Sequence, residues 1–289
     1  MKKNNLVSII MNCYNGEKYL SESVKSIIDQ TYKNWELIFW DNLSKDNSKK
    51  ILLSFKDNRI KYFRGSKHVN LYKARNLAIN KAKGKYLCFL DTDDTWEKFK
   101  LKKQLKKIKN TNDLVFSNYY FLKNEKKKIA INNKKNQSFS TQNLLDNYCI
   151  GLLTVMVDVV FFKKNKLKFN GKYNIIGDFD FFIKLSKKIN FNYISEPLAT
   201  YRYHDNNFSK KNSSLIVKER NLWTKENKKY FKNYDLNKFL SETSYLKIKI
   251  YAFKNELIKF FTEFFKLPFN LKKIRLLILV FSPKKYFSF

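Results

Sequence analysis

The sequence predicts an α/β fold in which a mostly parallel, doubly wound sheet is flanked by helices and followed by a helical C-terminal extension. Short apolar runs alternate with helical patterns at short intervals in the first half of the chain, which is typical of such a sheet. Polar side chains stand directly after several predicted strands, where open α/β sheets bind ligands. Beyond about residue 212 the pattern becomes wholly helical.

The first half of the chain contains four predicted strands separated by three predicted helices. The strands are short runs rich in β-branched and aromatic residues, at 6–11, 36–40, 60–63 and 86–90. The helices have apolar residues at helical spacing, at 17–30, about 46–56 and 70–83.

The second half alternates less regularly. Helices are predicted at about 97–110, near 141–148 and at 181–188, the last one opened by residues 174–180. Strands are predicted at 113–121, 152–160, 191–194 and 198–203, and the polar stretch 123–140 is expected to be a loop or hairpin.

The composition, with 44% hydrophobic residues, excludes global disorder. The net charge of +34 is compatible with nucleic acid, an anionic membrane or an anionic substrate as partner. The charge is spread along the chain, and residues 211–289 hold 18 Lys and Arg against 6 Asp and Glu. Lys, Asn, Ile, Phe and Tyr are enriched together, which indicates a compositional bias. We therefore expect no nucleic-acid partner.

The cysteines and the apolar segments bear on localisation. Cys13, Cys88 and Cys149 lack the spacing of a zinc site or a disulfide framework, so buried free thiols in a reducing compartment are expected. The N-terminal apolar segment is too short for a signal peptide, and the run from Leu276 to Phe281 is too short to span a bilayer. We expect a cytoplasmic protein, with peripheral contact at the inner face of the cytoplasmic membrane left open.

An acidic cluster, Asp91-Thr92-Asp93-Asp94, follows the apolar run 86–90. Clustered carboxylates at a strand end suit Mg²⁺ or Mn²⁺. The same residues could instead form a solvated turn that caps the next helix, with Asp94 or Thr95 as N-cap. The cluster alone does not decide between a metal site and a cap.

Three side chains are expected to converge at one edge of the sheet. Tyr14, Asp41 and Asp91 each lie just past the end of a predicted strand. The carboxyl ends of parallel strands share one edge, so these side chains can reach one ligand.

With these elements placed, the chain resembles the family 2 glycosyltransferases, whose catalytic domain has the GT-A fold that binds nucleotide-diphosphosugars. The resemblance covers roughly residues 5–205. It rests on motifs that follow one another in the same order, at residues 7–15, 26–32, 36–44, 74–76, 84–94, 177–178 and 202–204. It implies a GT-A catalytic domain over residues 1–210 and a helical, basic, amphipathic region over 211–289.

The resemblance implies how the donor, a nucleotide-sugar, is bound. Tyr14 would stack on the nucleobase, and Asp41 and Asn42 would help to fix it. The family often has two acids at the latter positions, so Asn42 weakens the inference that the base is uracil, although an amide can still pair with an imide edge. Arg75 would lie near the diphosphate.

The resemblance also implies a metal-dependent, inverting reaction. Asp91 would approach the ribose and metal-bound groups, and Asp93 of this DXD motif would bind Mn²⁺ or Mg²⁺. His204 matches a position that holds a metal or diphosphate ligand. Asp178 occupies the place of the general base, with Asp180 as its competitor, although the family's usual Glu-Asp pair is here Gly177-Asp178. Asp94 would serve the fold at a helix start.

The implied acceptor is a hydroxyl of a bacterial surface glycan or glycolipid, and the donor is expected to be a UDP-sugar. The rival is an inactive module on the same fold that binds membrane or nucleic acid. Residues 245–266 are expected to form one basic amphipathic helix, which would bind an anionic membrane, pack on the catalytic domain or pack on a second subunit of a homo-oligomer.

Overall fold

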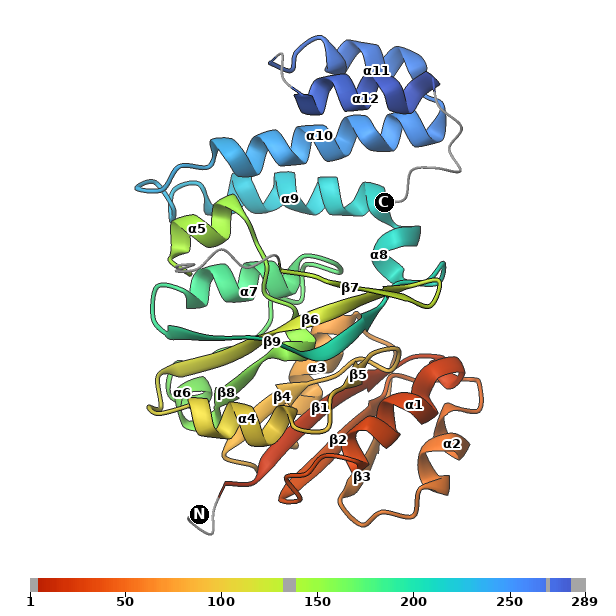
Figure 1. The fold of residues 1–289 in the computed structure, drawn as a ribbon, viewed down its shortest axis with the longest axis vertical. Helices are drawn as coiled ribbons and strands as arrows, with labels where there is room; N and C mark the ends of the chain where they lie inside the picture. Colours follow the sequence, from red (N-terminus) through yellow and green to blue (C-terminus); the bar gives the residue numbers. More distant parts are fainter. Residues whose placement is uncertain (1–4, 132–138, 269–270, 282–289) are drawn as a thin grey trace. The chain divides into compact units, whose positions relative to one another are not determined.

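The computed structural model describes residues 5–131, 139–268 and 271–281 (Figure 1). The chain divides into two compact units. The first comprises Met1–Thr141 and Tyr148–His204, and the second comprises Gln142–Asn147 and Asp205–Phe289.

Four parallel strands form the first part of the sheet in the first unit. Strand β1 pairs with both β2 and β4, and β2 also pairs with β3. Every residue of β1, β2 and β4 is buried, as expected for parallel strands covered on both faces. The strands are β1 (Val7–Cys13), β2 (Trp35–Asp41), β3 (Ile60–Arg64) and β4 (Tyr86–Phe89).

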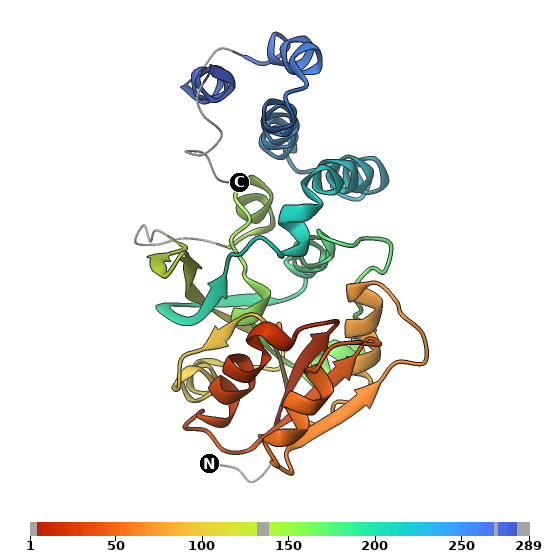
Figure 2. The same ribbon diagram turned by 90° about the vertical axis from the view of Figure 1, so that its right-hand side faces the viewer.

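Helices cover both faces of these strands (Figure 2). On one face α1 (Glu17–Ile28), α2 (Ser48–Ser54) and α4 (Lys100–Lys107) pack against alternate residues of the strands, including Ile9 and Phe39. Helix α3 (Leu71–Ile79) contacts β1 and β2 and contributes nothing to that cluster, so it covers the opposite face. The predicted alternation of strands and helices is confirmed here.

The remaining strands complete the sheet and bring the end of the acidic cluster next to β9. The sheet continues from β4 through β8 and β6 to β9 and β5, with β6 and β9 parallel and the pairs β4–β8, β8–β6 and β9–β5 antiparallel. Strand β5 directly follows Asp94, and Thr95 lies opposite Thr200. The strands are β5 (Thr95–Trp96), β6 (Asp113–Lys123), β7 (Lys126–Ile129), β8 (Met156–Asp158) and β9 (Asn190–Arg202).

Two predictions in the second half are wrong. Residues 152–160 form no single strand but a 3-10 turn, η1 (Leu152–Thr154), then β8, then α6 (Val159–Lys164). The Asp158 side chain accepts a hydrogen bond from the backbone N–H of Val160 (2.7 Å), which starts the helix. The strands predicted at 191–194 and 198–203 are one strand, β9, with a change of register against β6 before Pro197.

Three further segments differ in detail from the prediction. The predicted hairpin is formed by β6 and β7, and residues 132–138 of that stretch lie outside the described residues. The helix expected at 97–110 spans only α4, whose N-cap is Phe99, so Asp94 does not cap it. The helix expected at 181–188 begins earlier, as α7 (Gly177–Leu185).

The second unit is helical. Its helices α10, α11 and α12 share an apolar cluster that includes Ile248, Phe260 and Leu276. The single helix predicted at 245–266 is wrong, because Asn255 adopts a left-handed conformation (φ 61°) that ends α10 and lets α11 begin at Leu257. The helices are α5 (Thr141–Asp146), which starts at the end of the first unit, α8 (Phe208–Lys211), α9 (Ser213–Asn227), α10 (Asn237–Lys254), α11 (Leu257–Phe264) and α12 (Leu271–Phe281).

Candidate functional site

The carboxyl ends of β1 and β2 lie side by side, since Cys13 pairs with Asp41. Tyr14 follows β1, and its side chain is half exposed (52%), which leaves a ring face available to a ligand. The Tyr14 ring lies 4.4 Å from the His68 ring, centroid to centroid. His68 Nδ1 is in turn 3.0 Å from the backbone oxygen of Asn42. No role for His68 could be predicted from the sequence, because it lies in a loop without a motif.

Asp41 and Asn42 are buried and form hydrogen bonds within the protein. Asp41 accepts from the hydroxyl of Tyr62 (2.7 Å), from the backbone N–H of Ser44 (2.7 Å) and from Arg64 (3.2 Å). The Asn42 amide bonds both the carbonyl and the N–H of Val69 (2.7 and 3.2 Å). These bonds hold the loops beside Tyr14 in place.

Asp91 forms an ion pair with Arg75 on α3. The two are joined by a hydrogen bond of 2.9 Å from Arg75 Nη2 to Asp91 Oδ1. The Arg75 side chain is only 3% exposed, whereas that of Asp91 is 42% exposed. The guanidinium also lies 5.5 Å from the ring centroids of Tyr72 and Phe169, which fixes its orientation. A buried, oriented guanidinium beside an accessible carboxylate suits a polar, anionic ligand.

Asp93 meets His204, which lies 111 residues later in the chain. Asp93 Oδ2 and His204 Nε2 are 3.0 Å apart, because the pairing of β5 with β9 brings the two segments together. Burial, and then the neighbouring Asp91 charge, raises the pKa of Asp93, while His204 opposes this shift. The Asp93 carboxylate is thus in surroundings where an added positive charge would be stabilising.

Asp94 has a structural position, although it caps no helix. Its Oδ1 accepts a hydrogen bond from the backbone N–H of Arg202 (2.9 Å), and the Arg202 guanidinium donates to the backbone oxygen of Asp93 (3.0 Å). Burial, followed by the charges of Asp93 and Asp91, raises the pKa of Asp94 well above its usual value. Asp94 and Arg202 therefore fix the acidic turn against β9.

Asp178 lies in the first turn of α7 and faces Tyr72 of α3. The Tyr72 hydroxyl is 3.3 Å from Asp178 Oδ1 and 2.6 Å from the carbonyl oxygen of Ile175. Burial raises the pKa of Asp178, while the N–H of Phe179 and the Arg75 charge oppose this. The absence of a side chain at Gly177 is required here, since a Cβ at that position would lie 2.5 Å from the Tyr72 ring.

The structure thus brings most of the predicted site residues into two groups, which the chain segment from Asp91 to Asp93 links. Asp178, Tyr72, Arg75 and Asp91 form one chain of contacts, and Asp93 with His204 forms the other. Asp41 is bonded to neither group. Tyr72 was not singled out from the sequence, but its spacing of three residues from Arg75 places both on one face of α3 and could have indicated it.

The donor set at Asp93 and His204 fits a divalent cation that is completed by a substrate. Among the described residues no group of three or more His, Cys, Asp or Glu side chains is arranged to hold a metal ion. Mg²⁺ is commonly held by one or two carboxylates together with substrate phosphates, and carboxylates also suit Mn²⁺. The two protein donors, of which Asp93 lies two residues from the Asp91 that pairs with Arg75, agree with that pattern.

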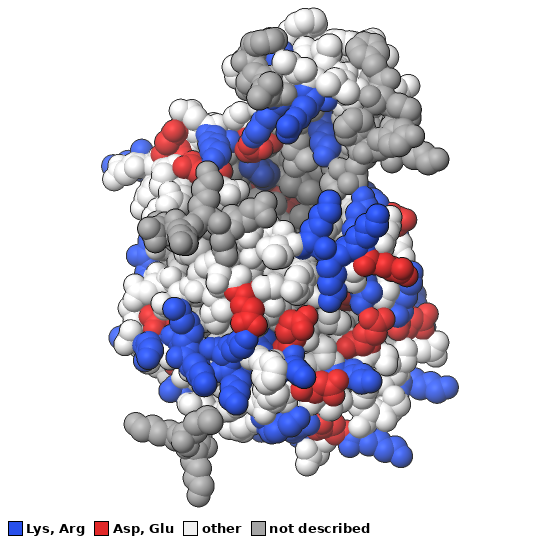
Figure 3. Space-filling model, in the orientation of Figure 1, with Lys and Arg blue, Asp and Glu red and all other residues white. Residues whose placement is uncertain are grey.

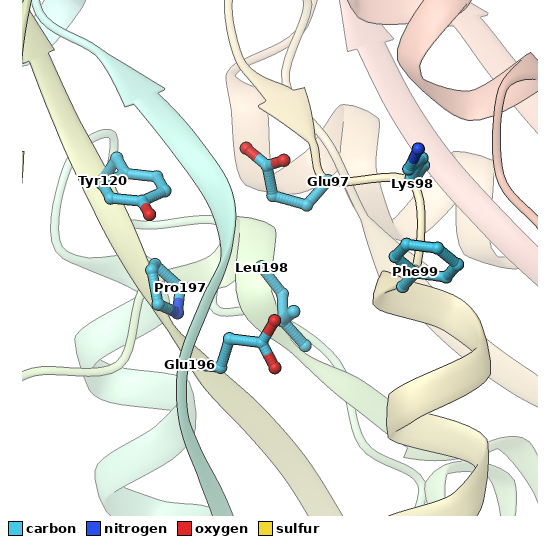
Figure 4. Close-up of a pocket in the computed structure, with 7 residues that line it drawn as sticks. All are labelled: Glu97, Lys98, Phe99, Tyr120, Glu196, Pro197 and Leu198. Atoms are coloured by element: carbon cyan, nitrogen blue, oxygen red, sulfur yellow. The ribbon is translucent and has the colours of Figure 1, made fainter.

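A hollow of about 260 Å³ elsewhere on the first unit contains none of these residues (Figure 4). It lies between the segment that joins β5 to α4, strand β6 and strand β9, and Glu196 on its wall is paired with Lys103. It is lined by Glu97, Lys98, Phe99, Tyr120, Glu196, Pro197 and Leu198.

Comparison with known proteins shows which proteins the chain is similar to. The profile of glycosyl transferase family 2 matches residues 8–168. An uncharacterised glycosyltransferase of Methanocaldococcus jannaschii is 32% identical over 260 residues, which cover 86% of this chain and 88% of that protein. WfgD of Escherichia coli, named a UDP-Glc:α-D-GlcNAc-diphosphoundecaprenol β-1,3-glucosyltransferase, is 39% identical over 154 residues. That match spans 53% of this chain and 60% of WfgD.

The fold agrees with this relationship. The solved structure of S. aureus TarS residues 1–349 in complex with UDP superposes with a TM-score of 0.61, at 19% identity, over 83% of this chain and 69% of that one. The GT-A fold expected from the motifs is confirmed by this likeness. The chain belongs to glycosyl transferase family 2.

Proposed function

We propose that residues 1–210 form a catalytic domain that transfers a sugar from a nucleotide-diphosphate donor to a hydroxyl of a bacterial surface glycan. The observation that carries this proposal is the pair of linked groups, Asp178–Tyr72–Arg75–Asp91 and Asp93–His204, on the fold of this family. An acid–base group, an oriented guanidinium and a pair of metal donors are what displacement of a diphosphate requires.

The donor in this proposal is a UDP-sugar. The exposed Tyr14 ring stacks on the base, with His68 behind it, while Asp41 and Asn42 hold the walls of the base site. The bound UDP in TarS and the UDP-Glc in the name of WfgD support this choice of nucleotide.

Arg75 and Asp93 serve the diphosphate end of the donor. Asp93 and His204 would hold Mn²⁺ or Mg²⁺, which when bound neutralises negative charge on the departing diphosphate. Arg75 is already oriented by Asp91 and two aromatic rings, so it can donate to phosphate oxygens without further ordering. Asp91 stays accessible to the sugar part of the donor.

Asp178 is the general base of a single displacement that inverts the anomeric carbon. The acceptor oxygen forms a bond to that carbon as the bond to the diphosphate oxygen breaks, and the acceptor proton passes to Asp178. The raised pKa of Asp178 increases its proton affinity and thus favours this transfer.

We further propose that the acceptor is carried on a lipid and that the second unit contacts an anionic membrane. WfgD is named for an undecaprenol-linked acceptor. Ile258 on α11 (86% exposed) and Phe265, the C-cap of that helix (74%), lie on the side opposite the buried Phe260. Ile274 and Ile278 are likewise exposed on α12. Residues 254–280 carry six Lys and Arg against two Glu.

This surface suits peripheral contact, not insertion across a bilayer. Among the helices described, none is both long and apolar enough to cross a membrane. Apolar side chains flanked by lysines are typical of helices that lie in the interface of an anionic membrane. On the face shown in Figure 3, by contrast, basic side chains lie in several places with acidic ones among them.

The Asp178→Asn variant tests the base. We expect transfer to fall about 10²- to 10⁴-fold, because an amide cannot accept the acceptor proton. The affinity for UDP, measured by calorimetry, should stay unchanged. Burial raises the pKa of Asp178, so the kcat of the wild type should fall on acidification at a pH above the pKa of an ordinary carboxyl group. This acidic limb of the pH profile should be absent in the variant.

The matched control is Asp180→Asn, which removes a carboxylate from the same helical turn where it pairs with Lys184. Its transfer rate should stay near that of the wild type. Near-normal turnover in Asp178→Asn would contradict the assignment of the base.

Calorimetric titration of UDP with and without Mn²⁺ tests the metal donors. In the wild type we expect Mn²⁺ to tighten UDP binding, and in Asp93→Ala we expect this gain to vanish because a charged ligand to the cation is lost. Asp205→Ala is the control, since it removes an exposed carboxylate one residue from His204. Equal Mn²⁺ dependence in the wild type and Asp93→Ala would exclude Asp93 as a ligand.

Sedimentation with vesicles tests the membrane contact. The double variant Ile258→Gln/Phe265→Gln should bind vesicles of phosphatidylcholine and phosphatidylglycerol more weakly than the wild type, because apolar area is lost from the interface. Leu53→Gln, at an exposed apolar position on α2 (53%), should bind like the wild type. Undiminished binding by the double variant would refute this surface as the contact.

A further inference from the structure

Tyr148 has a buried hydroxyl group that has no hydrogen-bond partner among the described residues. The residue follows α5 and belongs to the same compact unit as Asp178. A buried polar atom without a partner is uncommon in native proteins, since leaving it unpaired costs about 1–3 kcal/mol. Such an atom is therefore a candidate for contact with a ligand.

The surroundings of Tyr148 connect it to Asp178. Its ring packs edge-to-face on Phe179, with centroids 5.3 Å apart. The backbone N–H of Phe179 donates to Asp178 Oδ1 (2.8 Å), so Tyr148 packs on the residue that holds the carboxylate. Burial, and next the charge of Asp178, raises the pKa of Tyr148 well above its usual value. The hydroxyl is consequently protonated at neutral pH and can act as a donor.

The second phenol near Asp178 is used differently. The Tyr72 hydroxyl lies 2.6 Å from the carbonyl oxygen of Ile175, so its proton is engaged within the protein. Tyr72 thus orients the site, whereas the Tyr148 proton has no acceptor in the described protein. The hydroxyl of Tyr72 is therefore used within the protein, whereas that of Tyr148 is available to a ligand near Asp178.

We propose that Tyr148 contacts the acceptor, donating its hydroxyl hydrogen bond to an oxygen of the acceptor sugar beside the hydroxyl that Asp178 deprotonates. This inference rests on the proposed function and adds a residue that selects the acceptor. A polyhydroxylated sugar presents oxygens next to the attacking one, so a fixed donor at this point favours a particular orientation of the acceptor. Tyr148 takes no part in binding the nucleotide.

The test is Tyr148→Phe, which keeps the ring that packs on Phe179 and removes only the hydroxyl group. The assay follows UDP release from UDP-glucose with a short-chain lipid α-D-GlcNAc-diphosphate as acceptor and Mn²⁺ present. We expect the KM for the acceptor to rise about 3- to 10-fold, the size expected for one hydrogen bond. The KM for UDP-glucose and the Kd for UDP should not change.

Tyr32→Phe is the matched control. Its hydroxyl bonds the backbone oxygen of Asn5, near the amino end of β1 and thus at the opposite edge of the sheet from the site. This variant should keep the wild-type KM for both substrates. It therefore separates a general effect of removing a tyrosine hydroxyl from the specific effect at Tyr148.

The outcomes separate this inference from the proposed function. If the wild type transfers sugar and Tyr148→Phe keeps the wild-type acceptor KM, the role of Tyr148 is refuted and the proposed function stands. A shift of the acidic limb of the pH profile without a change in acceptor KM also refutes it, because Tyr148 would then act through Asp178. If the wild type transfers no sugar from UDP-glucose or other UDP-sugars to this acceptor or other glycan acceptors, the proposed function fails and this inference fails with it.

Discussion

The candidate site depends on compensation of carboxylate charge by a buried arginine. Asp91, Asp93 and Asp94 follow β4, and Asp178 of α7 is connected to Asp91 through Tyr72 and Arg75. Burial raises the pKa of Asp93, Asp94 and Asp178. Arg75, buried under Tyr72 and Phe169, pairs with Asp91 and opposes the shift at Asp178. A single guanidinium thereby connects the donor side of the site to the proposed base, and the same charge arrangement favours a bound cation.

Much of this arrangement could be predicted from the sequence because it follows from strand order. The alternation of short strands and helices predicts the parallel half of the sheet, and the ends of its strands place Tyr14, Asp41 and Asp91 at one edge. The motifs in turn indicated Asp178 and His204. The local pattern predicts which element carries each side chain, and the structure places Tyr14, Asp41 and Asp91 at or just past the ends of β1, β2 and β4.

The contacts between distant segments could not be predicted in this way. Asp93 meets His204 only because β5 pairs antiparallel with β9, and Gly177 is explained only by the Tyr72 ring packed against it. His68 and Tyr148 carry no motif, so only their neighbours reveal them. The turn at Asn255 was likewise hidden, because an apolar stripe continues on both sides of one left-handed residue. These features depend on tertiary packing, which a local pattern does not contain.

A crystal structure of the chain with UDP and Mn²⁺, with anomalous data to locate the metal, would show directly whether Asp93 and Arg75 hold the donor diphosphate. We expect a manganese peak bonded to the Asp93 carboxylate and the diphosphate, with the uracil ring against Tyr14 and with Arg75 close to the phosphates. UDP bound away from the carboxyl edge of β1, β2 and β4, or manganese held without Asp93, would contradict it.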